Sequence, residues 1–191
     1  MFDKKLSYGI IFSFVLFMVF FAIGAFTINQ NSESAEMLLQ ALNDDLFSYI
    51  NEQSPPQMAV TLFINNLEAS LLLFIGGATF GIVTLMILLT NGVIIGFVVE
   101  YAAKIQGSAA VVAGIVPHGI FEIPAFIIAS GLGFLLAESM WLEFKGMDDA
   151  AEYAGKLARV FLMVVIPLLA AAAIIEAFIT PQIIDLVVQG V

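Results

Sequence analysis

The stretch VPHGIFEIPAFIIASGLGFLLA, residues 116–137, is long and apolar enough to cross a bilayer as one helix, yet His118 and Glu122 lie near its start. A membrane-spanning helix needs about 20 mostly apolar residues. Ionisable side chains at that depth are costly, and they usually face the interior of a helix bundle or a water-filled cavity. The stretch therefore predicts a transmembrane helix beside a buried polar centre.

The composition of the whole chain extends this prediction. Hydrophobic residues make up 61% of the 191 residues and charged residues 12%, whereas soluble domains have roughly 45–50% and 25%. The length gives room for about five spanning helices. We therefore predict an all-α, polytopic membrane protein with a single integral membrane domain over residues 1–191.

Charge and cysteine content exclude several functions. The chain has 16 acidic and 6 basic residues, for a net charge of −10, which argues against binding nucleic acid or attracting anionic lipid headgroups. Cysteine is absent, so disulfides and thiolate metal ligands are excluded. A metal site would need His, Asp or Glu.

Hydropathy places the predicted spans and the polar segments between them. The apolar run over residues 6–28 exceeds the usual core of a cleaved signal peptide, which favours a retained span. The polar segment 29–56 has apolar residues at helical spacing and predicts an amphipathic helix outside the cytoplasm. The five predicted spans are residues 6–28, 67–90, 92–116, 117–137 and 157–178, and residues 138–156 are predicted to form a cytoplasmic loop.

Basic residues predict the orientation of the chain. In a five-span arrangement, most of them fall on one side of the membrane, namely Lys4, Lys5, Lys145, Lys156 and Arg159. Cytoplasmic segments are enriched in Lys and Arg, so the amino terminus is predicted to be cytoplasmic and the carboxyl terminus to lie outside. Lys104 does not fit this pattern and must snorkel or belong to a re-entrant break.

A helix break is predicted between Gln106 and Pro117. Gly107 and Gly114 allow the chain to turn, and Pro117 is suited to the first position of a new helix. Residues 92–116 are therefore either one crossing or a helix broken near Gly107. Pro124 leaves a further backbone carbonyl without its helical donor, which requires cover from protein or water.

Glycine spacing predicts where helices pack closely. Gly77 with Gly81, and Gly92 with Gly96, each form a G-x-x-x-G pattern. In lipid such patterns let helix backbones approach each other. Packing within the bundle is favoured over a homodimer.

The polar residues inside the apolar runs define a candidate site. His118 and Glu122 are four residues apart and so share a helix face, and Glu176, Asn66 and Asn91 are the other candidates for the same polar centre. Three interpretations remain open. The centre could be a structural lock, a proton or ion site, or a divalent metal site such as a Zn²⁺ site, with His118, Glu122 and Glu176 as ligands. The zinc protease pattern HExxH is absent.

Four motifs together carry a resemblance to a known family. They are NN at 65–66, NGVIIG at 91–96, PHGIFEIPA at 117–125 and IIEAFITP at 174–181. With these motifs the chain resembles the integral membrane family named after stage II sporulation protein M. The resemblance implies a helical, multi-pass protein of the plasma membrane of a bacterium or archaeon. It also implies that the motif positions are Asn66, Asn91, His118, Glu122 and Glu176.

The resemblance also bears on function. The named member resembles a membrane anchor that recruits peptidoglycan-degrading partners and is not itself the hydrolase. A non-enzymatic scaffold or complex subunit, with protein partners or as a homo-oligomer in the bilayer, is therefore the first expectation. A transporter or channel component is the second, and an intramembrane metal-dependent hydrolase is the third. No cofactor other than a divalent metal is suggested.

Overall fold

All regular structure in the described residues is helical, which confirms the predicted fold class. The computed structural model describes residues 2–30, 53–147 and 149–189. The predicted amphipathic helix of segment 29–56 falls mainly on residues 31–52, which lie outside the described residues. The helices are α1 (Phe2–Gln30), α4 (Pro55–Ile75), η2 (Gly76–Thr79), α5 (Ile82–Gln106), α6 (Ser108–Phe144), α7 (Ala150–Val160), η3 (Phe161–Val165), α8 (Ile166–Phe178) and α9 (Thr180–Gln189).

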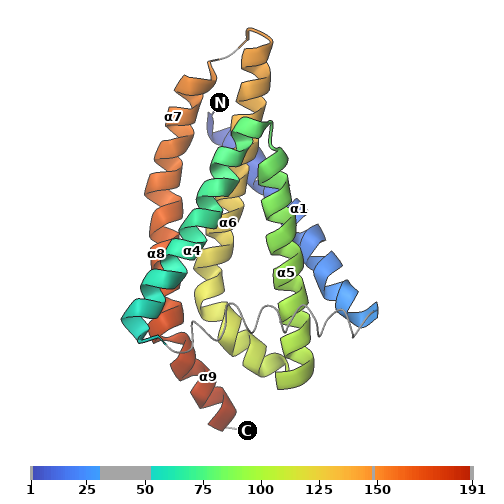
Figure 1. Cartoon of the computed structure of the whole chain (residues 1–191), viewed down its shortest axis with the longest axis vertical. Coiled ribbons are helices and arrows are strands. Elements are labelled where there is room, and N and C mark those ends of the chain that lie inside the picture. The colour runs from blue at the N-terminus through green and yellow to red at the C-terminus, as the bar shows by residue number, and fades with distance from the viewer. Residues whose placement is uncertain (1, 31–52, 148, 190–191) are drawn as a thin grey trace.

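Five helical segments are long and apolar enough to cross a membrane, as the composition predicts. They are residues 4–27, 55–79, 82–106, 108–144 and 150–178. The last of these is a continuous rod of α7, a π-helical turn and α8. Figure 1 shows the five segments alternating in direction along one long axis, with α9 continuing past the end of α8.

The predicted span 67–90 is wrong, because the chain reverses within it. α4 ends in the 3₁₀ turn η2, and Phe80 and Gly81 follow with φ values of 54° and 81°. Left-handed φ values of this kind suit a tight turn, and glycine adopts them at no steric cost. The reversal consists almost entirely of apolar residues, so hydropathy alone does not mark it.

The predicted first residue of this span, residue 67, is also wrong, because α4 begins earlier. Pro55 and Pro56 occupy the first two helical positions, where a missing amide hydrogen costs nothing. The Ser54 amide donates to Oε1 of Gln57 at 3.2 Å. This half of a capping box fixes the helix start, so the span begins at Pro55 and not at residue 67.

The predicted boundary at Pro117 is also wrong. α5 ends at Gln106, the chain turns a corner at Gly107 with φ 86°, and α6 then runs on through Gly114, Pro117 and Pro124. The predicted spans 92–116 and 117–137 are therefore parts of α5 and α6 divided in the wrong place. Figure 1 shows that α6 changes direction in its first third instead of ending there. Each proline removes one helical hydrogen bond, and membrane helices tolerate this where neighbours cover the freed carbonyl.

The predicted cytoplasmic loop 138–156 is shorter than expected. α6 continues to Phe144 and α7 begins at Ala150, where the Asp149 carboxylate accepts hydrogen bonds from Ala151 N and Glu152 N at 3.0 Å each. This cap satisfies two amides at the helix start. As a result α6 and α7 form a hairpin that extends beyond the α4–α5 turn at that end of the bundle (Figure 1).

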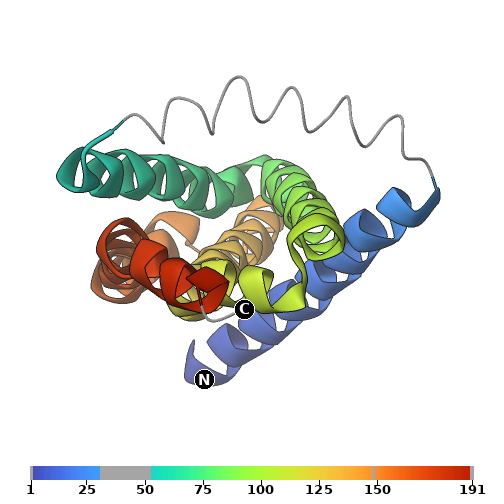
Figure 2. The same cartoon turned by 90° about the horizontal axis from the view of Figure 1, so that it is seen from below.

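Helix α6 is the central element of the bundle. It contacts α1, α4, α5, α8 and α9, and Figure 2 shows it enclosed by these helices. It is also the most deeply buried of the five crossing segments. The core around it contains fully buried leucines on α4, α5, α6, α7 and α8, which are Leu73, Leu88, Leu132, Leu157 and Leu169.

Glycines let two pairs of helices touch backbone to backbone. A Cβ atom at Gly96 of α5 would overlap the carbonyl oxygen of Phe21 on α1, and one at Gly24 of α1 would overlap that of Val93. Gly77 and Gly133 make the matching contact between η2 and α6. Among the other predicted packing glycines, Gly92 lies against Phe20, whereas Gly81 serves the turn.

We expect Gly96→Ala to destabilise the protein. The added methyl group must push α1 and α5 apart, and overpacking of this kind costs about 1–3 kcal/mol. Gly155→Ala is the matched control, because Gly155 lies in α7 and no atom of the described residues lies within 4 Å of a Cβ built there. Thermal unfolding of the detergent-purified proteins measures the effect. Equal midpoints for wild type and Gly96→Ala would contradict the close contact.

Candidate metal centre

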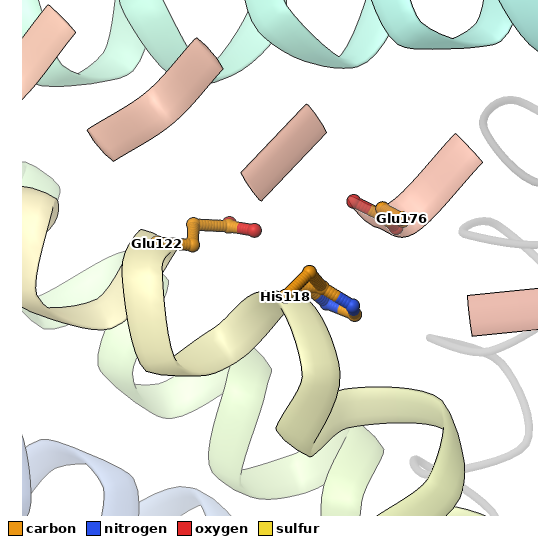
Figure 3. A group of neighbouring side chains, drawn as sticks. All are labelled: His118, Glu122 and Glu176. Carbon is orange, nitrogen blue, oxygen red and sulfur yellow. The ribbon is translucent and has the colours of Figure 1, made fainter. Parts of the chain in front are cut away.

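Three ionisable side chains from two helices meet inside the bundle. His118 and Glu122 lie one turn apart on α6 and share a face, as residues at i and i+4 do. Glu176 lies on α8. Figure 3 shows the α6 pair and Glu176 directed into the same space.

The geometry of the three groups is compact. Each offers one ligand atom, and these atoms all lie within 4.8 Å of one another. All three side chains are half-buried. One imidazole and two carboxylates in this arrangement can all bind the same metal ion.

Asn66 is the fourth polar group of the centre. It lies on α4 and lines the same cavity as Glu122, where its side-chain amide can donate to that carboxylate. His118 differs, because its Nδ1 atom is buried and has no hydrogen-bond partner among the described residues. Buried polar atoms normally have a bonding partner, so the lack of one at this nitrogen needs an explanation.

The charge of the centre is not balanced within the described residues. Glu122 and Glu176 place two carboxylates close together, and no Lys or Arg is among the described residues that line the adjoining cavity. Uncompensated carboxylates at membrane depth are costly. The site therefore needs protons or a bound cation.

A cavity of about 280 Å³ adjoins the polar centre. Its polar lining is Asn66, His118, Glu122 and Glu176, and the rest of the lining is apolar. One wall is the face of α5 that carries Ile94, Ile95, Val98 and Val99. Leu62, Ile115, Gly119 and Ile123 complete it.

The other predicted site residues lie elsewhere. Asn91 donates to the carbonyl oxygen of Ile87 on its own helix at 2.9 Å and does not line the cavity. Gly107 forms the corner between α5 and α6, and Gly114 lies within α6. Pro117 and Pro124 both lie inside α6, and Pro124 is exposed.

The aliphatic wall on α5 was not foreseen in the sequence. Polar residues in apolar runs draw attention to a site, but Ile94 and Val98 resemble any lipid-facing residues of a span. Only the divergence of α4 and α5 from their shared turn makes these residues line a cavity (Figure 1). No pattern in the sequence marks that divergence.

The residues present fit a divalent transition metal. Ligand bonds to Zn²⁺ are about 2.0–2.2 Å long, so two ligands of a tetrahedral ion are about 3.3–3.6 Å apart. The ligand atoms of the three side chains lie within 4.8 Å of one another, so the side chains must rotate to bring them about 1–1.5 Å closer around one ion. Ca²⁺ accepts longer bonds but prefers oxygen, whereas imidazole suits Zn²⁺ and its neighbours.

These features define a helical membrane protein with a polar centre among its helices. A family model described as Stage II sporulation protein M matches residues 13–181, and the chain belongs to that family. The chain is also similar to an uncharacterized protein of Methanocaldococcus jannaschii, with 31% identity over 181 residues that cover 91% of this chain and 94% of the relative. No solved structure gives a significant match.

We expect Asn66→Leu to lower the thermal stability of the protein, because it removes a hydrogen-bond donor from a half-buried carboxylate. A hydrogen bond to a charged group contributes about 1.5–3 kcal/mol. Asn65→Leu is the matched control, since Asn65 is exposed on the same helix. Unfolding midpoints in detergent compare the two. A loss for Asn65→Leu as large as that for Asn66→Leu would count against a role for the bond.

Proposed function

We propose that this member of the family is a metal-binding membrane protein, in which His118, Glu122 and Glu176 hold one divalent cation. The observation that carries the proposal is the convergence of their three ligand atoms within 4.8 Å. A divalent cation neutralises the two carboxylates, and Zn²⁺ suits the mixture of one nitrogen and two oxygen donors.

The unsatisfied histidine favours this role over a purely structural lock. In a lock the polar groups satisfy one another, because a partly satisfied buried network is less favourable than an apolar core. Here His118 Nδ1 has no partner among the described residues. A metal ion would be a bonding partner for this nitrogen, and its positive charge would offset the charges of the two carboxylates.

Three protein ligands leave a coordination position free. Structural zinc sites usually have four protein ligands, whereas catalytic sites have three and an open position. A metal-dependent reaction, which includes hydrolysis, is therefore the chemistry that the donor set best supports. A transport role would use the same ion as cargo and not as a resident cofactor.

The metal content of the purified protein tests this proposal. We expect about one Zn²⁺ per chain in wild type, and loss of most of it in His118→Ala, Glu122→Gln and Glu176→Gln, because two ligands bind a cation far more weakly than three. Glu68→Gln is the control, since Glu68 is an exposed carboxylate on α4. Metal analysis after dialysis measures the content. A wild-type protein without metal after growth in zinc would refute the proposal.

A scaffold is the second candidate function, and the α6–α7 hairpin is the observation that favours it. The hairpin extends beyond the rest of the bundle at its end (Figure 1), and its tip exposes Phe144 and Met147. Exposed apolar side chains on a protruding element suit contact with a protein partner or a second copy. The family resemblance implies a membrane anchor, and metal binding does not exclude that role.

We further propose that the amino terminus and the α6–α7 hairpin are cytoplasmic. The basic residues Lys5, Lys145 and Lys156 lie at this end of the bundle, whereas Lys104 lies at the other. Trp141 supports a membrane edge here, because Phe80 packs edge-on to its ring and Lys145 Nζ lies 4.7 Å above it. Indole rings favour the headgroup region.

Cysteine labelling tests the orientation cleanly, because the chain has no native cysteine. Ser108→Cys and Met147→Cys place single thiols at opposite ends of the bundle, both at exposed positions. In intact spheroplasts a membrane-impermeant maleimide is expected to label Ser108→Cys alone, and to label Met147→Cys only after lysis. The reverse pattern would invert the proposed orientation.

A further inference from the structure

We infer that the cavity beside His118, Glu122 and Glu176 binds a single-chain acyl ester, with its chain against α5 and its carbonyl oxygen at the polar centre. This inference rests on the proposed metal site, because it assigns a ligand to the coordination position that three protein donors leave open. It names a ligand class and assigns no reaction.

The lining of the cavity selects an aliphatic chain. Four side chains on α5, two on α6 and one on α4 are Leu, Ile or Val, and none of the described residues that line the cavity is Phe, Tyr or Trp. Branched aliphatic side chains give a chain of methylene groups dispersion contacts and no hydrogen bonds. The polar groups Asn66, His118, Glu122 and Glu176 gather at one place in the lining, so the cavity as a whole is amphiphilic.

The depth of the cavity places it within reach of membrane lipid. Asn66 lies near the middle of the apolar segment 55–79. Ile94, Val98 and Ile115 are partly exposed, so the described residues do not seal the cavity. α4 and α5 also diverge from their shared turn (Figure 1). A ligand can therefore enter sideways from the hydrocarbon region, which excludes a strongly hydrated molecule.

The size of the cavity limits the ligand to one chain. Pockets for drug-sized molecules are about 300–1,000 Å³, and a cavity of about 150 Å³ lined by apolar side chains holds benzene. At about 280 Å³, this cavity has room for part of one acyl chain. A phospholipid with two chains and a charged headgroup does not fit.

Charge balance selects the head of the ligand. Glu122 and Glu176 together neutralise one divalent cation, so the open position best takes an uncharged oxygen. A carboxylate there would leave a net negative charge at membrane depth, which is costly. An ester carbonyl meets this requirement, and a fatty acid meets it less well.

The test uses the full chain in proteoliposomes and three photoreactive probes, each with a diazirine on its acyl chain. The probes are a monoacylglycerol, a fatty acid and a phosphatidylcholine. After irradiation, peptide mass spectrometry locates the labelled residues, and unlabelled monoacylglycerol competes for the site. Specific binding is saturable, whereas contact with bulk lipid is not.

Two variants fill the cavity, and one serves as control. Val98→Trp fills it from α5 and Ile115→Phe fills it from α6. Val19→Trp is the control, because it makes the same change of Val to Trp at an exposed position on α1. Unfolding midpoints and zinc content are measured on every sample. If one cavity-filling variant is misfolded, the result of the other is used to test the inference.

We expect saturable labelling of α5 and α6 by the monoacylglycerol in wild type and in Val19→Trp, and its loss in Val98→Trp and Ile115→Phe. The fatty acid should bind about tenfold more weakly, and the phosphatidylcholine should label without saturation. Non-saturable monoacylglycerol labelling in wild type would overturn the inference, as would equal saturable labelling in a folded filling variant. Saturable phosphatidylcholine labelling of the cavity would overturn it too.

Zinc content separates this inference from the proposed function. Wild-type protein that holds zinc but gives no saturable labelling overturns the acyl ester site and leaves the metal site standing. Wild-type protein without zinc overturns the metal site, and the coordinated ester with it. If the metal site is present, His118→Ala should lose its zinc and weaken monoacylglycerol binding by about tenfold, and unchanged affinity would refute the head-group contact.

Discussion

Close contact between helix backbones at glycines is the constraint on which the bundle depends. In lipid no hydrophobic effect draws helices together, so association relies on close packing. Gly133 on α6 meets the backbone of α4, and Gly96 on α5 meets that of α1. The Thr84 hydroxyl donates to the Leu73 carbonyl oxygen at 2.8 Å and joins α5 to α4 at the same level. The contacts of Gly133 and Thr84 hold α4, α5 and α6 together near the α4–α5 turn.

The polar centre lies away from the α4–α5 turn, where α4 and α5 are no longer in close contact. Away from the turn α4 and α5 diverge (Figure 1), and the cavity beside the polar centre is lined by α4, α5, α6 and α8. α6 changes direction in its first third (Figure 1), and Pro117, inside the helix just before His118, cannot donate a helical hydrogen bond. The bend and the divergence together give His118 and Glu122 a cavity to face, and Glu176 approaches from α8.

A metal-binding centre and a scaffold role are physically compatible in this fold. The centre is built from α4, α6 and α8, whereas the α6–α7 hairpin extends from the far end of α6 (Figure 1). α6 is therefore common to both, and it contacts every other crossing helix.

The sequence by itself determined the class of this protein, because apolar composition and run length follow from the bilayer thickness. It also singled out His118 and Glu122, since a histidine and a carboxylate one turn apart in an apolar segment share a helix face. It did not show that the chain reverses at Gly76–Gly81 or that α6 continues through Pro117. An apolar turn looks like a span, and a proline looks like a helix start. The tertiary structure decided that Glu176 and Asn66 join the pair while Asn91 bonds to its own helix, because that depends on how helices rotate and diverge when they pack.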